Sequence, residues 1–163
     1  VYNYRYAGGD VTIYKMTGKQ LKDYMEWAAD YFDTIQPGDT EYRYNSERAG
    51  RKYVTFDIFG GVKYKIDLRN EKGNKITDLM LVNGKEITSE MELKVGMNAY
   101  RFEQLARKGG IFDGQKIPVL WASKEKIGEI DGTIQNMMID YIRNVKNGVI
   151  EGKSHNNWEI IGL

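Results

Sequence analysis

The chain has 163 residues, of which 41% are hydrophobic, so it is long enough to form one globular domain with a hydrophobic core. Its 24 basic and 23 acidic side chains nearly cancel, and no stretch gathers five like charges, which argues against binding of polymeric nucleic acid. The absence of cysteine excludes disulfides, thiolate metal sites and cysteine nucleophiles.

The single histidine, His155, limits the catalytic chemistry that the chain can perform. Hydrolytic metal centres and histidine general bases usually draw on several imidazoles. His155 stands in a polar segment, residues 152–157, that is typical of an exposed loop, and we assign it no role. The chain has no apolar run long enough to span a membrane, and it begins at Val1 without a signal-like segment, as a piece of a longer protein would.

The first predicted elements are a strand and a helix. Residues 11–16 alternate in the manner of a strand, and Thr17 is a plausible N-cap for the helix after it. The helix is indicated by apolar residues at helical spacing: Leu21, Tyr24, Met25, Ala28 and Phe32. Residues 34–52 show no period and are predicted to be a long connection.

The middle of the chain predicts strands. Residues 62–68 alternate between apolar and charged side chains, which indicates a strand with one buried face. Residues 76–82 form a second apolar run, after which Asn83-Gly84 favours a two-residue hairpin turn into residues 85–87. Residues 92–98 predict a further short strand, followed by a helical turn or two that ends at Gly109-Gly110.

The last third predicts a strand at residues 117–122, a helix from about residue 131 to 146 and a terminal strand around Trp158. The order of these elements does not repeat βαβ units, which favours an α+β fold. We therefore expect residues 1–163 to form a single domain with a mixed, largely antiparallel sheet packed by two main helices.

Two aromatic residues are candidates for ligand contact. Phe56 precedes the pair Gly60-Gly61, and Tyr100 stands with Asn98 and Arg101 at the predicted junction between a strand and a helix. Both rings could instead pack in the core, and Arg101 could be solvated or salt-bridged. If Phe56 and Tyr100 met across a cleft, the two rings could stack on a flat ligand such as a nucleobase.

Other chemistry has weaker support. An aromatic surface for sugars is a possible use of six tyrosines, although aromatic strand faces are more often core. These tyrosines are Tyr2, Tyr4, Tyr6, Tyr42, Tyr44 and Tyr53. No Ser-His-Asp set, phosphate-binding loop or metal-ligand spacing is present, so we expect no catalytic residue and no metal ligand in this chain.

The order of several motifs resembles the carboxy-terminal domain of the 5'-nucleotidase family. The motifs are "MTGKQLKDYMEW" (16–27), "FDIFGGVKYKIDL" (56–68), "ITDLMLVNGKEI" (76–87), "NAYR" (98–101) and "NNWEI" (156–160). The resemblance covers nearly the whole chain and is closest to the bacterial bifunctional 2',3'-cyclic-nucleotide 2'-phosphodiesterase and 3'-nucleotidase branch.

The resemblance implies a substrate-recognition domain. In this family the carboxy-terminal domain stacks the base between two aromatic rings, which by position are Phe56 and Tyr100. Asn98 and Arg101 belong to the same motif, and Asp113 would correspond to a ribose-binding acid that follows a glycine pair, although its spacing from Tyr100 is longer here. An amino-terminal metallophosphatase domain with two divalent metal ions performs the hydrolysis in the family.

The metal-binding residues of that domain are absent from this chain, so we expect the fragment alone to be inactive. Its expected partners are a nucleoside or nucleotide and the metallophosphatase domain of the same polypeptide. The family implies an extracellular, periplasmic or cell-wall location. The alternative function is a non-catalytic scaffold or surface-binding module that retains the fold. The preference among 2',3'-cyclic, 3'- and 5'-nucleotides is left open.

Overall fold

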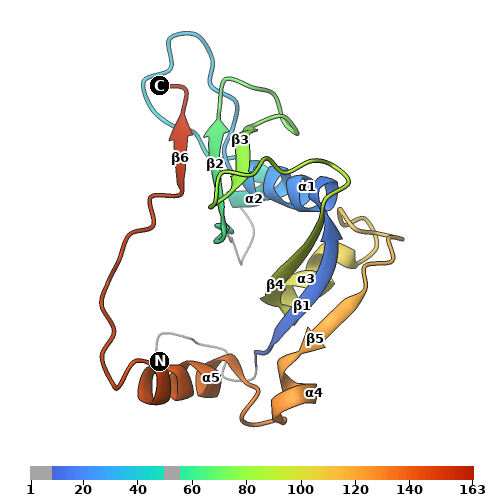
Figure 1. The fold of residues 1–163 in the computed structure, drawn as a ribbon. Helices are drawn as coiled ribbons and strands as arrows, with labels where there is room; N and C mark the ends of the chain where they lie inside the picture. Colours follow the sequence, from blue (N-terminus) through green and yellow to red (C-terminus); the bar gives the residue numbers. More distant parts are fainter. Residues whose placement is uncertain (1–8, 50–55) are drawn as a thin grey trace. The chain divides into compact units, whose positions relative to one another are not determined.

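The fold is that of a computed structural model, which describes residues 9–49 and 56–163. Figure 1 labels its elements, which in chain order are β1 (Val11–Thr17), α1 (Gly18–Ala29), α2 (Ser46–Ala49), β2 (Val62–Asp67), β3 (Ile76–Leu81), β4 (Glu92–Asn98), α3 (Ala99–Ala106), β5 (Val119–Ala122), α4 (Ser123–Ile127), α5 (Ile134–Asp140), the π-helical turn η1 (Tyr141–Val145) and β6 (Trp158–Ile161).

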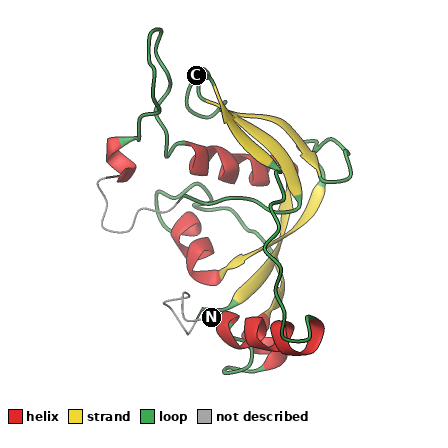
Figure 2. Cartoon of the chain, turned by 90° about the vertical axis from the view of Figure 1, so that its left-hand side faces the viewer, coloured by secondary structure: helices red, strands yellow, loops and turns green. Residues whose placement is uncertain are grey.

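The chain divides into two compact units. The first contains Val1–Met16 and Glu92–Ser154, and the second contains Thr17–Met91 and His155–Leu163. Each unit is therefore built from two separate stretches of sequence, and the chain enters each of them twice. Strands and helices occur in both units. Figure 2 distinguishes the two kinds of element by colour along the chain.

The second unit contains a three-stranded sheet in the order β3-β2-β6. Strand β2 runs antiparallel to β3 and parallel to β6. The predicted alternation is confirmed for Val62, Tyr64 and Ile66, which are buried, and for Lys63, which is exposed. It was wrong for Asp67, which is buried at the end of β2, where its carboxylate accepts hydrogen bonds from Arg69. Helix α1 belongs to the same unit and contacts β3, with the predicted residues Leu21 and Met25 buried. The core of this unit therefore contains the apolar stripe of α1 and the apolar face of β2.

Helix α1 begins as the sequence predicts, with Thr17 as its N-cap. The Thr17 hydroxyl accepts a hydrogen bond from the Gln20 N–H at 3.1 Å, and the Gln20 side chain accepts one from the Thr17 N–H at 2.9 Å. The two bonds form a capping box, which satisfies two N–H groups that the first helical turn leaves free. A side chain at Gly18 would collide with the carbonyl oxygen of Thr88, so the close backbone approach requires glycine there.

The hairpin turn after β3 differs from the predicted two-residue turn. Only Gly84 has a positive φ, of 87°, whereas a two-residue turn of the Asn-Gly type requires a positive φ at Asn83 as well. The Leu81 N–H instead donates to the Lys85 carbonyl across a three-residue loop, with an isolated antiparallel bridge between Met80 and Glu86. The hairpin is confirmed, but the two-residue turn was wrong because Asn83 uses its side chain to accept the Lys85 N–H.

The first unit contains a second three-stranded sheet, in the order β4-β1-β5, with β1 and β5 antiparallel. Its core is formed by the buried face of β1 and by α3. Phe102 of α3 stacks on Tyr14 of β1 with 3.9 Å between ring centroids, and Leu105 and Phe112 are fully buried. Burial raises the pKa of the Tyr14 hydroxyl.

The predicted late helix is present as α5 and η1, and it begins at the Thr133 N-cap rather than near Asp131. The chain leaves it through Asn147 and Gly148, which both have positive φ, as the predicted end of the helix requires. Among the described residues no side chain of α5 or η1 is fully buried. The apolar stripe that predicted this helix is therefore only partly covered.

The predicted α+β class is confirmed, with two main helical segments, α1 and α5 with η1. The pairs β1–β5 and β2–β3 are antiparallel, and β2–β6 is parallel. The strands form two three-stranded sheets instead of a single sheet. The predicted long connection contains the short helix α2. Within the described residues, no helix combines the length and apolar character that a membrane crossing requires.

Candidate functional site

Tyr100 is the predicted stacking residue that the structure leaves exposed. It is the second residue of α3, and 66% of its surface is accessible to solvent. Asn98 is the N-cap of this helix, and its side-chain oxygen accepts a hydrogen bond from the Tyr100 N–H at 2.8 Å. The motif therefore lies at a strand-to-helix junction, as predicted, and Asn98 contributes to the position of Tyr100.

Packing on the other side of α3 determines which way Tyr100 points. Phe102 and Leu105 face the first-unit sheet, and Phe102 also contacts Phe112 with 6.2 Å between ring centroids. Side chains two positions apart on a helix do not share a face, so the packing of Phe102 on Tyr14 leaves Tyr100 outside the core. The Tyr100 ring can therefore offer its face to a ligand.

The other predicted residues of the first unit lie around the two ends of α3. Arg101 is half-buried next to Tyr100. Asp113 follows the helix and is exposed, and its carboxylate accepts the Gly109 N–H at 2.8 Å. Gly109 has a φ of 77°, so this hydrogen bond closes a tight turn. Asn98 thus caps the N-terminus of α3, and Asp113 stabilises the turn that follows the helix.

Phe56 belongs to the second unit and is half-buried. Its ring lies 5.3 Å from Phe32, 5.6 Å from Tyr31 and 5.8 Å from Trp158 between centroids. The contacts are edge-on or tilted, which is the arrangement that packed aromatic rings favour. Phe56 is therefore one member of an aromatic cluster, and part of its surface remains open to solvent.

The tyrosines considered for sugar binding are only partly described. Tyr42 and Tyr44 are exposed and precede α2, and Tyr44 contacts Tyr31 and Phe32 at the edge of the same aromatic cluster. The others, Tyr2, Tyr4, Tyr6 and Tyr53, lie outside the described residues. His155 is exposed, as predicted.

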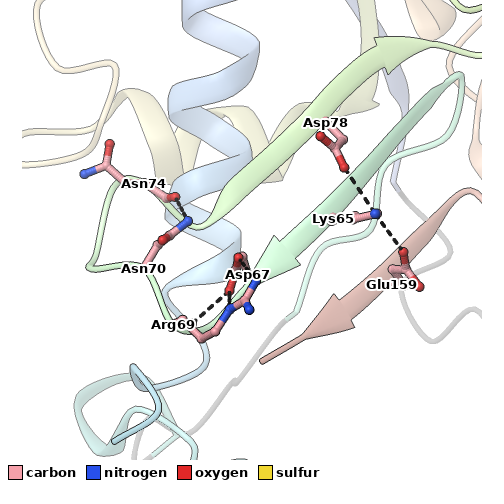
Figure 3. Close-up of polar contacts among 7 residues, drawn as sticks. All are labelled: Lys65, Asp67, Arg69, Asn70, Asn74, Asp78 and Glu159. Carbon is pink, nitrogen blue, oxygen red and sulfur yellow. Dashed lines mark hydrogen bonds and ion pairs between the residues drawn. The ribbon is translucent and has the colours of Figure 1, made fainter. Parts of the chain in front are cut away.

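The exposed face of the second-unit sheet carries a row of paired charges (Figure 3). Lys65 of β2 lies between Asp78 of β3 and Glu159 of β6, at 3.2 and 3.5 Å. Asp78 has a φ of 53° where the β2–β3 register shifts, and this β-bulge re-aims its side chain. The hydrogen bond with Asp78 raises the pKa of Lys65. This lysine already has two carboxylate partners, so it is a poor candidate for a phosphate ligand.

The adjoining end of β2 carries a second charge pair. Arg69 donates two side-chain hydrogen bonds to Asp67, at 2.8 and 2.7 Å (Figure 3). These bonds hold the pKa of Asp67 below its usual value. Asn70 donates to the carbonyl of Asn74 in the turn between β2 and β3. All of these contacts stabilise the sheet and its turn.

A buried polar cluster joins α1 to β3. The Glu26 carboxylate accepts the backbone N–H groups of Lys75 and Ile76 at 2.8 and 2.9 Å. Lys75 is only 2% exposed, and its ammonium donates to the carbonyl of Phe32. Burial lowers the pKa of Lys75, against the opposing effect of nearby carboxylates, of which Asp30 is the strongest. The sequence did not predict this cluster, because nothing in its local pattern marks two distant charged residues as buried partners.

The described part of the chain offers no set of metal ligands. Across residues 9–49 and 56–163, no group of three or more His, Cys, Asp or Glu side chains could hold a metal ion. The family resemblance assigns the two divalent ions to an amino-terminal domain and not to these residues.

Comparison with known proteins identifies the family of this chain. The family model "5'-nucleotidase, C-terminal domain" matches residues 1–108. The chain is 32% identical over 161 residues to the trifunctional nucleotide phosphoesterase protein YfkN of Bacillus subtilis, covering 92% of this chain and 10% of that protein. It is 24% identical over 168 residues to the 2',3'-cyclic-nucleotide 2'-phosphodiesterase/3'-nucleotidase of Haemophilus influenzae, covering 94% of this chain and 24% of that protein.

Solved structures show the same fold. A putative 5'-nucleotidase from Staphylococcus aureus, in complex with alpha-ketoglutarate, matches with a TM-score of 0.71 at 20% identity over 97% of this chain and 28% of its own. A 5'-nucleotidase precursor from Thermus thermophilus matches with a TM-score of 0.55 at 14% identity over 96% of this chain and 26% of its own. The chain thus spans about a tenth to a quarter of the curated relatives. It belongs to the family of 5'-nucleotidase carboxy-terminal domains.

Proposed function

We propose that this chain is the substrate-recognition domain of a nucleotidase or 2',3'-cyclic-nucleotide phosphodiesterase. It holds the nucleobase of the substrate by aromatic stacking, with Tyr100 and Phe56 as the stacking residues. An upstream metallophosphatase domain of the same polypeptide, with two divalent metal ions, supplies the hydrolysis of the phosphate ester. The family relationship and the names of the relatives support this assignment.

The exposed ring of Tyr100 is the observation that carries the proposal. A large aromatic side chain that is 66% exposed gains little from burial in the core, yet a capped helix and the packing of Phe102 keep it in place. Stacking of a base on an aromatic side chain contributes about 1–3 kcal/mol. The helix cap fixes the backbone at Tyr100, so binding of a base requires no ordering of the backbone there.

Phe56 is proposed as a second stacking residue, and it differs from Tyr100 in its exposure to solvent. Its ring is half-buried, and Tyr31, Phe32 and Trp158 restrict its movement. Only part of the ring remains for a ligand, so we expect Phe56 to contribute less than Tyr100. Its removal should also disturb the aromatic cluster, which must be separated from any effect on binding.

In this proposal, the cellular location of the protein and its class of substrate are those that the family resemblance implies. A nucleotidase of this kind is proposed to act outside the cytoplasm, in the periplasm, in the cell wall or in the medium. A stacked base contributes affinity for any nucleotide, because every base has a π-face. Selection among 2',3'-cyclic, 3'- and 5'-nucleotides is then shared with the metal-containing domain.

Steady-state kinetics of the longer polypeptide that carries this chain test the proposal. Replacement of Tyr100 by alanine should raise KM for 3'-AMP and for 2',3'-cyclic AMP by about fivefold or more, as loss of a stacked base predicts. Replacement by phenylalanine keeps the aromatic face and should leave KM within about twofold of the unchanged protein. Tyr141→Ala is the matched control, because Tyr141 is also an exposed tyrosine of the first unit.

A non-catalytic scaffold is the second candidate function. The observation in its favour is that Asn98, Asp113 and Phe56 all make contacts that a purely structural role explains. This candidate predicts that Tyr100→Ala and Tyr141→Ala have the same KM as the unchanged protein. That result would remove the recognition role proposed for Tyr100.

A further inference from the structure

Asn157, which immediately precedes β6, joins the end of the chain to the segment that carries Phe56. The side-chain Nδ2 of Asn157 donates to the Phe59 carbonyl and to the Val62 carbonyl, both at 2.8 Å. An amide nitrogen has two hydrogens, and both are therefore used in these bonds. The acceptors stand 98 and 95 positions earlier in the sequence, so the contact depends on the tertiary fold.

The two carbonyls lie on either side of the pair Gly60-Gly61. Gly61 has a φ of 80°, and a side chain placed at either glycine would meet no described atom within 4 Å. The two glycines themselves therefore add no side-chain packing, although the Phe59 ring beside them packs on Tyr24 and Tyr64, and hydrogen bonds hold the backbone of the turn. Besides the two bonds from Asn157, the Gly61 carbonyl accepts the Val82 N–H at 3.2 Å.

The neighbours of Asn157 hold the same segment from other directions. The carbonyl of Asn157 accepts the Tyr64 N–H at 3.1 Å, which begins the parallel pairing of β2 with β6. The next residue, Trp158, contacts the Phe56 ring and stacks on Tyr64 with an interplanar angle of 15°. The beginning of β6 thus contacts both the backbone after Phe56 and the Phe56 ring.

We propose that Asn157 is a positioning residue for nucleotide recognition. By holding the Phe59 and Val62 carbonyls with one amide, it sets the path of the segment from Phe56 to Val62 and thereby the direction in which the Phe56 ring is presented. The inference rests on the proposed function, since it assumes that Phe56 contacts the base. If the inference holds, substrate binding also depends on the residues at the beginning of β6.

Replacement of Asn157 by aspartate is the sharpest test, because aspartate has the same shape but no hydrogen to donate at neutral pH. Its carboxylate would face two carbonyl oxygens. In the longer polypeptide, Asn157→Asp should raise KM for 3'-AMP about tenfold while kcat stays within about twofold, as loss of positioned ground-state binding predicts. Asn157→Gln keeps the amide on a longer side chain and should raise KM by about threefold.

Asn83→Asp is the matched control. Asn83 is exposed in the same unit, and its side chain accepts the Lys85 N–H, a bond that aspartate preserves. This variant should keep the KM of the unchanged protein. A 4-fluorophenylalanine at position 56 supplies the structural measurement, because its fluorine NMR signal should shift in Asn157→Asp and stay in place in Asn83→Asp.

The outcomes separate this inference from the proposed function. If Phe56→Ala raises KM while Asn157→Asp and Asn157→Gln leave both KM and the fluorine signal unchanged, the positioning role is overturned and the recognition role of Phe56 stands. If Phe56→Ala leaves KM unchanged, the stacking role of Phe56 is overturned, and the positioning role fails with it. A raised KM in Asn157→Gln with a normal melting temperature supports the proposal even where Asn157→Asp is unfolded.

Discussion

Glu26 in α1 and Lys75 before β3 are joined by a buried hydrogen bond, in which the Glu26 carboxylate accepts the Lys75 N–H at 2.8 Å. The same carboxylate accepts the Ile76 N–H, and the Lys75 ammonium donates to the Phe32 carbonyl after α1. The Glu26 side chain thus binds the backbone at the beginning of β3, and the Lys75 side chain binds the backbone that follows α1. This arrangement fixes α1 against the beginning of β3.

Replacement of Glu26 by alanine should strongly destabilise the second unit. The change leaves two buried N–H groups without acceptors and removes a carboxylate that offsets the buried charge of Lys75. Loss of a buried charged hydrogen-bonding group typically costs about 3–5 kcal/mol. Urea denaturation followed by circular dichroism should show this loss in the free energy of unfolding. Glu90→Ala, an exposed glutamate of the same unit, should change it by less than about 0.5 kcal/mol.

Replacement of Gly18 by alanine should destabilise the chain even though alanine is the better helix former. A Cβ at this position would collide with the carbonyl oxygen of Thr88, and backbone must move to accommodate it. Overpacking of this kind typically costs about 1–3 kcal/mol. Gly152→Ala is the control, since a Cβ there meets no described atom within 4 Å. Equal melting temperatures for the two variants would show that the approach of Thr88 to α1 is not as close as described.

Asn98 should act mainly through its cap of α3. Asn98→Ala removes the acceptor for the Tyr100 N–H and should lower the free energy of unfolding by about 1 kcal/mol. Asn98→Ser and Asn98→Asp retain a good capping group and should stay within about 0.5 kcal/mol of the unchanged protein. If Asn98→Ser preserves stability but abolishes nucleotide binding, then the Asn98 amide contacts the nucleotide directly.

The Asp67–Arg69 pair should make stability depend on pH in the acid range. The hydrogen bonds from Arg69 lower the pKa of Asp67 below its ordinary 3.8, so the folded state releases this proton more readily than the unfolded state. The resulting stability is fully present above pH 3.8 and is lost as the pH falls through the lower, folded pKa. Arg69→Gln should reduce this acid loss. Carbon NMR titration of the Asp67 carboxyl should show its pKa return towards 3.8 in that variant; an unchanged pKa would contradict the assignment.

Local patterns in the sequence predicted the main elements because each has a local physical cause. The alternation of Val62 to Leu68 follows from one buried sheet face, and Thr17 supplies both the cap and the start of α1. The predicted two-residue turn at Asn83 was wrong because Asn-Gly is compatible with more than one loop, and the side chain of Asn83 favours the longer one.

Contacts between distant residues account for the features that the sequence did not show. Glu26 with Lys75, and Asn157 with the Phe59 and Val62 carbonyls, pair residues that stand far apart in the chain. Nothing in the composition or period of either stretch marks the partner. For Tyr100, the sequence pattern predicted a position at a strand end but did not determine whether the ring is buried or exposed. In the structure Phe102 packs on Tyr14, and the Tyr100 ring is exposed.

The ring NMR signals of Tyr100 test the central claim most directly. In the longer polypeptide with ring-labelled tyrosine, saturating adenosine should shift the Tyr100 signals upfield, since a stacked base lies over the ring. Ribose 5-phosphate, which has no base, should leave them in place. The Tyr100→Phe variant assigns the signals by their disappearance. If adenosine binds, as its own broadened and shifted resonances report, and the Tyr100 signals do not move, then Tyr100 does not stack on the base and the proposed recognition role is contradicted.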